Sequence, residues 1–285
     1  MLKVRMRVWN CALASLAMFA VGWGANANAA VGDVITFATA PTQSVARTKE
    51  LYGPIAEYLS EKTGKEVKLV IPRNFLEYTS KMRKGEYDII FDGPHFVSWR
   101  MQSIKHIPVA RLPGALVFVA VVKEDAKINT IDDLIAKKVC AVNSPNLATL
   151  SIIDAFTNPV RQPVIVSQRS FKDAMKCLKL DKGAAAFLPV KFWNKFKKKG
   201  KTTGLKILYS TKERPLPPRT FSMTKTIDIV TRDKIVAALI NSEGQAGTKP
   251  VLDRFKSKRF VAAEANEYKG LARLLASVWG FHQGQ

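Results

Sequence analysis

The chain has few acidic residues, few histidines and few cysteines. Its 285 residues include 23 Asp and Glu against 45 Lys and Arg, a formal net charge of +22 at pH 7. The three histidines, His95, His106 and His282, lie far apart in the sequence and lack the spacing of metal ligands. We therefore expect no metal site and no cofactor.

The sequence also lacks the motifs that commonly carry catalysis. It has no Gly-x-Ser-x-Gly nucleophile elbow, no His-Glu-x-x-His zinc motif and no phosphate-binding P-loop. Asp92 and His95 could form a dyad, but they share one turn and have no nucleophile beside them. The sequence thus offers no catalytic residue and favours a binding protein over an enzyme.

No apolar run outside the first 30 residues is long enough to span a membrane. Lys3, Arg5 and Arg7 precede the apolar segment 11–21, and small residues follow at 25–30. The apolar segment is shorter than the roughly 20 residues that a bilayer requires. This order is typical of a secretory signal peptide. We expect cleavage after Ala29 or Ala30 and a periplasmic protein with a net charge of +19.

The strong positive charge has two explanations. It can attract anionic ligands or anionic envelope surfaces, or it can be general surface basicity. It is densest between Lys195 and Lys201, which is either a docking patch for an acidic envelope surface or a solvated helix end. An exported protein meets little nucleic acid, and the aromatic pattern of a nucleic-acid groove is missing. We expect no nucleic-acid partner.

Two cysteines, Cys140 and Cys177, follow the predicted signal peptide. In an oxidising compartment they could form a disulfide. The sequence leaves open whether their geometry allows the bond.

Strand and helix patterns alternate along the rest of the chain, which predicts parallel βαβ units and an α/β fold. A second series of these units is inserted into the first. We expect strands over 34–40, 67–71, 89–91, 138–142, 164–166, 184–188 and 205–209, and helices over 45–62, 75–84, 130–134, 143–156, 171–180, 190–199, 228–241 and 267–279.

Several short motifs recur in the order found in a known family. They are Tyr52-Gly53-Pro54, Thr63-Gly64, Met82-Arg83-Lys84-Gly85, Gly93-Pro94-His95-Phe96 and Pro215-Leu216-Pro217. In this order they resemble the periplasmic phosphate/phosphite/phosphonate-type substrate-binding proteins of ABC importers. The resemblance implies a two-lobed periplasmic-binding-protein-like fold of type 2, with two crossovers and a ligand in an interlobe cleft.

The resemblance also implies a division of the chain and a role. Lobe 1 would comprise 31–120 and 220–285, lobe 2 would comprise 121–219, and hinges would lie near 119–122 and 209–221. The protein, expected as a monomer, would capture a small anion and deliver it to an inner-membrane ABC permease. The alternative is a ligand-sensing or envelope-interaction subunit on the same fold.

Two loops that open helices supply most of the predicted ligand-binding residues. Free amides and the helix dipole favour oxyanions at such positions, although both loops could equally be plain helix caps. Ser144 is expected as a helix cap, with Pro145 as the first helical residue. The residues from the two loops are Thr42, Gln43, Ser144, Asn146 and Thr149.

Two further residues complete the predicted set. His95 lies in a Gly-Pro turn after the strand 89–91, and ligands in α/β sheets bind beyond such strand ends. Tyr78 stands where the family has a cleft tyrosine, although it could be a half-buried helix residue. The family's closely spaced hydroxyls are interrupted by Asn146-Leu147-Ala148, and its acidic residue is missing from Ala184-Ala185-Ala186. That missing acid argues against an aminoalkylphosphonate ligand.

Overall fold

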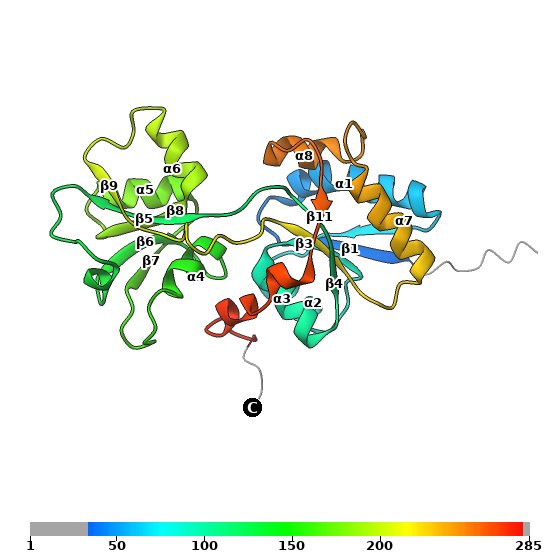
Figure 1. The fold of residues 1–285 in the computed structure, drawn as a ribbon, viewed down its shortest axis with the longest axis horizontal. Coiled ribbons are helices and arrows are strands. Elements are labelled where there is room, and N and C mark those ends of the chain that lie inside the picture. Colours follow the sequence, from blue (N-terminus) through cyan, green and yellow to red (C-terminus); the bar gives the residue numbers. More distant parts are fainter. Residues whose placement is uncertain (1–33, 282–285) are drawn as a thin grey trace, which may run out of the picture. The chain divides into compact units, whose positions relative to one another are not determined.

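The computed structural model describes residues 34–281, which contain two β-sheets (Figure 1). The six-stranded sheet has the order β11-β4-β10-β3-β1-β2 and the five-stranded sheet the order β7-β6-β8-β5-β9. The predicted signal peptide lies outside the described residues. The strands are β1 (Ile35–Thr39), β2 (Val67–Val70), β3 (Ile89–Asp92), β4 (Ile107–Arg111), β5 (Phe118–Lys123), β6 (Lys138–Val142), β7 (Val164–Gln168), β8 (Ala185–Pro189), β9 (Leu205–Ser210), β10 (Thr220–Met223) and β11 (Val261–Ala262).

Each sheet combines parallel and antiparallel pairs. β1 runs parallel to β2 and β3, and β6 runs parallel to β7 and β8, as the alternation of helices and strands predicts. β10 returns antiparallel between β3 and β4, and β5 lies antiparallel between β8 and β9. The predicted α/β fold class is confirmed.

Eight α-helices and three short 3-10 helices are present among the described residues. The N-cap Ser44 accepts a hydrogen bond from the Arg47 amide at 3.3 Å, and Gly64 ends the same helix with φ 74°. The α-helices are α1 (Val45–Thr63), α2 (Phe75–Arg83), α3 (Pro94–Ser103), α4 (Leu147–Ile153), α5 (Phe171–Lys179), α6 (Val190–Lys197), α7 (Ile229–Ile240) and α8 (Lys249–Phe255), and the 3-10 helices are η1 (Ile131–Leu134), η2 (Ala265–Tyr268) and η3 (Leu271–Leu275). None of these helices has the length and apolarity of a membrane span.

Alternating strand residues divide the core into three apolar clusters. The first packs one face of the six-stranded sheet against α1, α7 and α8, and the second packs one face of the five-stranded sheet against α5 and α6. The third contains the opposite faces of both sheets together with α2, α3, α4 and η3. Both sheets therefore contribute to one continuous apolar cluster.

The chain crosses between the two sheets twice, and the two crossing segments are hydrogen-bonded to each other. The Leu116 amide donates to the Leu216 carbonyl at 2.7 Å, and the Leu216 amide donates back at 2.9 Å. Residues 119–122, predicted as a hinge, lie inside β5 and pair with β8 and β9. The hinge near these residues therefore coincides with a paired strand, and its motion stays a prediction. The predicted lobe boundaries stay a prediction.

Three local predictions also need correction. Gly93-Pro94 does not form a turn but starts α3, because proline fits the first helical position, where no amide donor is needed. The helix predicted over 143–156 covers only 147–153. The helix predicted over 267–279 is replaced by η2 and η3, which Gly270 separates with φ 76°.

A disulfide joins Cys140 in β6 to Cys177 in α5. The Cα atoms are 6.0 Å apart, within the range that a disulfide requires, and both residues are buried. A Cβ added at Gly183 would lie 2.6 Å from the Cys140 sulfur, so a glycine is needed for the close approach. The bond fixes α5 against β6, which lies second in the five-stranded sheet.

Replacing both cysteines by alanine should lower the free energy of unfolding. The bond closes a loop with a sequence separation of 37 residues, for which the loss of loop-closure entropy corresponds to about 4 kcal/mol. Urea unfolding of the oxidised wild type and of the Cys140→Ala/Cys177→Ala variant measures the difference. Reductant should lower the stability of the wild type alone. A wild type that is insensitive to reductant would contradict the disulfide.

Candidate ligand-binding site

The candidate site lies where β1 and β3 end side by side. Thr39 pairs with Phe91 in the parallel register, so the loops that lead into α1 and α3 leave the same edge of the sheet. β10 runs antiparallel to β3, with Thr220 opposite Asp92. The residue before β10, Arg219, therefore reaches this same edge.

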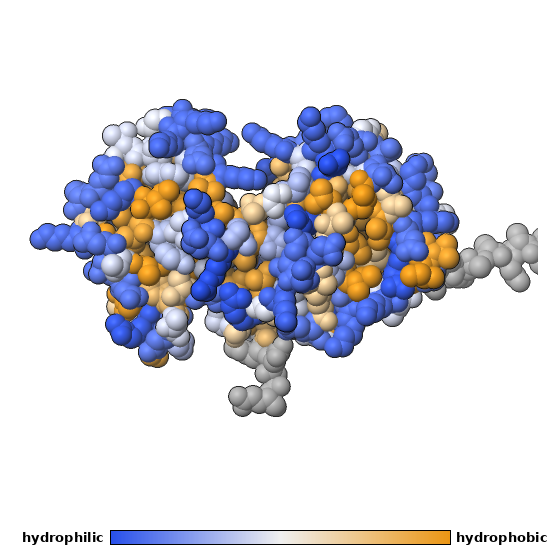
Figure 2. Space-filling view, in the orientation of Figure 1, coloured by the Kyte–Doolittle hydropathy of each residue, from blue (hydrophilic) through white to orange (hydrophobic). Residues whose placement is uncertain are grey.

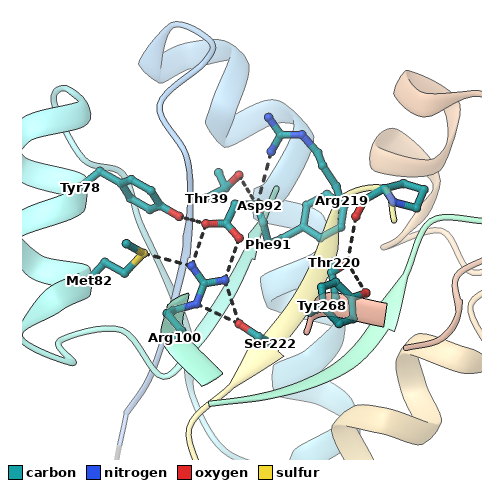
Figure 3. A network of polar contacts seen from close by, with 11 residues as sticks. Thr39, Tyr78, Met82, Phe91, Asp92, Arg100, Arg219, Thr220, Ser222 and Tyr268 are labelled. Atoms are coloured by element: carbon teal, nitrogen blue, oxygen red, sulfur yellow. Dashed lines mark hydrogen bonds and ion pairs between the residues drawn. The ribbon is translucent and has the colours of Figure 1, made fainter. Parts of the chain in front are cut away.

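Arg219 is the cation of the site. Its guanidinium donates to the Phe91 carbonyl at 3.4 Å (Figure 3). It also donates to the Thr42 hydroxyl at 3.4 Å. It also lies 5.7 Å from the centre of the Phe255 ring. The two hydrogen bonds are long and the side chain is only partly buried, so donor capacity remains for an anion. Sequence reasoning placed Arg219 in a stiff crossing segment and missed it, because only the sheet order shows where β10 begins.

His95 connects the loop after β3 with the loop after β6. Its Nε2 lies 3.3 Å from the Pro145 carbonyl oxygen. A carbonyl only accepts, so Nε2 carries the proton and Nδ1 is left as an acceptor. Within residues 34–281, Nδ1 has no hydrogen-bond partner although the residue is only 3% exposed. The ring packs against Phe96 with a centroid distance of 4.2 Å.

The histidine is electrically neutral at pH 7. Burial lowers the pKa of His95 to about 4, against the raising effect of the Asp92 charge and of the hydrogen bond to Pro145. The positive charges of Arg100 and Arg219 lower the pKa further. His95 thus adds a neutral acceptor, and Arg219 carries the positive charge of this edge.

The loop after β6 is arranged differently from the prediction. The N-cap of α4 is Asn146, whose side chain accepts from the Ala148 amide at 3.0 Å. Ser144 is exposed and caps nothing, because a turn closed by the Asn146 amide on the Asn143 carbonyl precedes the helix. The Thr149 hydroxyl donates to the Val142 carbonyl at 2.6 Å. Its proton is committed to this bond.

Tyr78 is fully buried, neither half-buried nor on a surface. Its hydroxyl donates a short hydrogen bond to Asp92. Burial, and then the Asp92 charge, raise the pKa of Tyr78 well above its usual value, so the phenol keeps the proton that it donates. Tyr78 therefore contributes to the candidate site by holding Asp92 in place.

Asp92 and Arg100 form a fully buried ion pair at the centre of this support (Figure 3). The guanidinium donates to both carboxylate oxygens, at 2.8 and 2.7 Å. It also donates to the Ser222 hydroxyl at 2.9 and 3.1 Å, and to the Met82 sulfur at 3.0 Å. The pair therefore connects β3, α3, α2 and β10. Sequence reasoning treated Asp92 as a turn residue and missed the pair.

The structure brings together only some of the predicted site residues. Thr42 meets Arg219, and His95 meets the loop that carries Ser144 and Asn146. Gln43 is exposed on the same loop as Thr42. Two surface cavities of about 480 and 500 Å³ are lined by residues of the five-stranded sheet and its helices and include none of the seven predicted residues. Over residues 34–281, no three metal-ligating side chains gather at one point.

The family of phosphonate periplasmic substrate-binding proteins of ABC transporters has a sequence model that matches residues 37–268. The chain belongs to this family. No curated protein sequence matches it significantly. The predicted family and its role, capture of a solute for an ABC transporter, are confirmed, and the family is one of transport proteins and not of enzymes.

Solved structures share the fold at low sequence identity. PhnD1 of Prochlorococcus marinus MIT 9301, in complex with methylphosphonate, is 17% identical with a TM-score of 0.64, over 85% of this chain and 97% of that one. A Xanthomonas citri protein bound to ATP is 12% identical with a TM-score of 0.70, over 85% and 96%. A phosphonate-transporter component of Pseudomonas aeruginosa is 17% identical with a TM-score of 0.61, over 85% of each chain. The two-lobed fold class is therefore confirmed.

Replacing Asp92 by asparagine should leave the Arg100 guanidinium buried without a counter-charge. We expect a loss of about 3–5 kcal/mol in the free energy of unfolding. The control is Asp253→Asn, which breaks the exposed ion pair with Lys249 and should cost less than about 1 kcal/mol. Urea unfolding at pH 7 compares the two. Equal losses would contradict the buried pair.

Acid should destabilise the protein through two buried histidines. Burial, and then the Arg100 charge, lower the pKa of His106 to about 3, and burial lowers that of His95 to about 4. The unfolded chain binds these protons near pH 6.5, whereas the folded chain binds them only near pH 4 and 3. The free energy of unfolding is therefore highest above pH 6.5 and decreases as the pH falls toward 4 and 3.

Each histidine should contribute a loss of about 2 kcal/mol between pH 7 and pH 5. The variant His106→Phe keeps a buried ring without a titrating group and should remove about half of the total loss. Unfolding curves at pH 7, 6 and 5 measure both proteins. A variant with the same pH dependence as the wild type would show that His106 is not held neutral.

Proposed function

We propose that the protein binds a small phosphonate- or phosphate-like anion at the edge formed by Arg219, Thr42, His95 and the loop after β6. The observation that carries this proposal is the position of Arg219. Its guanidinium lies at the carboxyl ends of β1 and β3, where ligands of α/β sheets bind, and its two hydrogen bonds are long. A guanidinium can donate two parallel hydrogen bonds to one phosphonate group.

His95 supports a ligand that carries a proton. Its buried Nδ1 is an acceptor without a partner in residues 34–281, and a buried polar atom without a hydrogen bond is costly. The hydroxyl of a singly protonated phosphonate can donate to it, whereas a fully ionised sulfate has only acceptors. Methylphosphonate and ATP, the ligands of two similar solved structures, are likewise phosphorus oxyanions.

The Asp92 carboxylate, at the end of β3, already has hydrogen-bond partners. Asp92 accepts from Arg100 through both oxygens and from Tyr78 through one. The segment Ala184-Ala185-Ala186 supplies no acidic residue. These features favour an alkylphosphonate or phosphate over an aminoalkylphosphonate, whose ammonium needs a free carboxylate.

The remaining predicted site residues take two roles in this proposal. Gln43, Ser144 and Asn146 lie on loops that can contact the ligand. Tyr78 and Thr149 position the site, through Asp92 and the Val142 carbonyl respectively. The protein would be exported through the cleavable signal peptide, act as a monomer and deliver its ligand to an inner-membrane permease. Between Lys195 and Lys201, it would meet an acidic envelope surface.

Replacing Arg219 by glutamine should weaken binding of methylphosphonate about tenfold or more, because a charge-assisted hydrogen bond contributes about 1.5–3 kcal/mol. Titration calorimetry at fixed ionic strength measures the affinity for methylphosphonate, phosphate, phosphite and sulfate. Arg214→Gln, in the same crossing segment but exposed, is the matched control and should bind normally.

Two results would contradict the proposal in different ways. Unchanged affinity of the Arg219→Gln variant would place the site elsewhere. A wild type that binds none of the phosphorus oxyanions would exclude the ligand class.

A further inference from the structure

One stretch of the five-stranded-sheet half has a composition that ligand capture does not explain. Residues 182–212 contain nine lysines and no arginine, aspartate or glutamate. We call the exposed lysines of α6 and the turn after it the lysine face; they are Lys191, Lys195, Lys197, Lys198, Lys199 and Lys201. None of them forms an ion pair with any residue in 34–281.

The backbone holds these charges close together. The Lys199 and Lys201 amides both donate to the Phe196 carbonyl at 3.0 Å, and the Gly200 amide donates to the Lys197 carbonyl at 3.0 Å. Lys197, Lys198, Lys199 and Lys201 therefore lie in one tight turn. Figure 2 shows hydrophilic side chains over the end of the sheet where α6 lies. Like charges at this density repel one another, and an anionic surface would relieve that repulsion.

Aromatic rings lie beside the lysine face. Phe192 and Phe196 are half-buried with a centroid distance of 4.8 Å, and Phe171 lies 5.6 Å from Phe192. Trp193, on the other side of the helix, is buried against the sheet. α6 therefore presents partly exposed aromatic rings framed by cations, a composition that suits the boundary between lipid headgroups and acyl chains.

We propose that the lysine face docks the protein on an anionic lipid bilayer. Lysine is a mobile point charge without the fixed fork of arginine, so lysines alone suit a fluid array of phosphate headgroups better than one shaped acidic site. The periplasmic family places the chain in a compartment that a membrane bounds. The proposal depends on this location and not on the identity of the captured ligand.

The test uses the exported and processed protein, because an uncleaved signal peptide would itself bind lipid. Co-sedimentation with vesicles of phosphatidylcholine alone is compared with vesicles of equal parts phosphatidylcholine and phosphatidylglycerol. Binding should require phosphatidylglycerol and should weaken as salt is raised. Each lysine near an anionic surface should strengthen binding about fivefold.

The variant Lys197→Glu/Lys198→Glu/Lys199→Glu should bind these vesicles at least about a hundredfold more weakly. The matched control, Lys256→Glu/Lys258→Glu/Arg259→Glu, changes the net charge by the same amount at exposed cations after α8 and should bind nearly as well as the wild type. Both variants should keep the wild-type melting temperature, and both should keep the affinity for methylphosphonate if the wild type binds it.

Three outcomes would overturn the proposal. The first is an absence of wild-type binding to phosphatidylglycerol vesicles. The second is an equal loss in both variants, which would show that net charge and not the lysine face matters. The third is binding to poly-L-glutamate beads but not to vesicles, which would indicate an acidic protein partner instead. Loss of methylphosphonate binding alone would affect the proposed ligand and leave the docking proposal standing.

Discussion

The buried ion pair between Asp92 and Arg100 is the interaction on which the candidate site depends. Removing both charges from water is costly, and the cost is offset only while every donor and acceptor keeps its partner. Tyr78, Met82 and Ser222 supply those partners, so helix α2 and strand β10 are held together with β3 and α3. Because Asp92 ends β3 and Gly93 caps α3, the pair also fixes the passage from strand to helix that carries His95.

The same pair determines the charge that a ligand would meet. Asp92 lies at the end of β3, but Arg100 and Tyr78 occupy its oxygens, so it is not available to pair with Arg219. His95 is neutral at pH 7 because of its burial. Arg219 is therefore the charged group that remains available at the carboxyl ends of β1 and β3. An anion is favoured there because Arg219 is positive, and also because Asp92 is already paired and His95 is neutral.

Periodicity in the sequence predicted most of the helices and strands, because α1, α5 and α6 each bury one apolar face. It could not show α3, since Gly93-Pro94 begins a helix as readily as a turn. Asp92 and Arg100 are only eight residues apart in the sequence. They can pair only when α3 packs beside the end of β3, which the sequence alone did not show. Arg219 required knowledge that β10 lies antiparallel to β3. Arg219 and the ion pair thus depend on sheet order and helix placement, whereas Thr42 and His95 could be proposed from sequence because strand ends are recognisable locally.

The two kinds of cation in this protein suit different tasks. Arginine presents a rigid fork of donors, which Arg100 uses to bond both oxygens of Asp92 and which Arg219 offers at the proposed site. Lysine predominates in the part from 121 to 219, whose 20 cations and 8 acids give +12 of the +19 expected for the processed chain. One small anion needs one or two cations and is screened from distant charges beyond about 8–10 Å. The bulk of the positive charge thus lies beyond what one small anion needs, and the proposed anionic membrane has the extent and charge to be its partner.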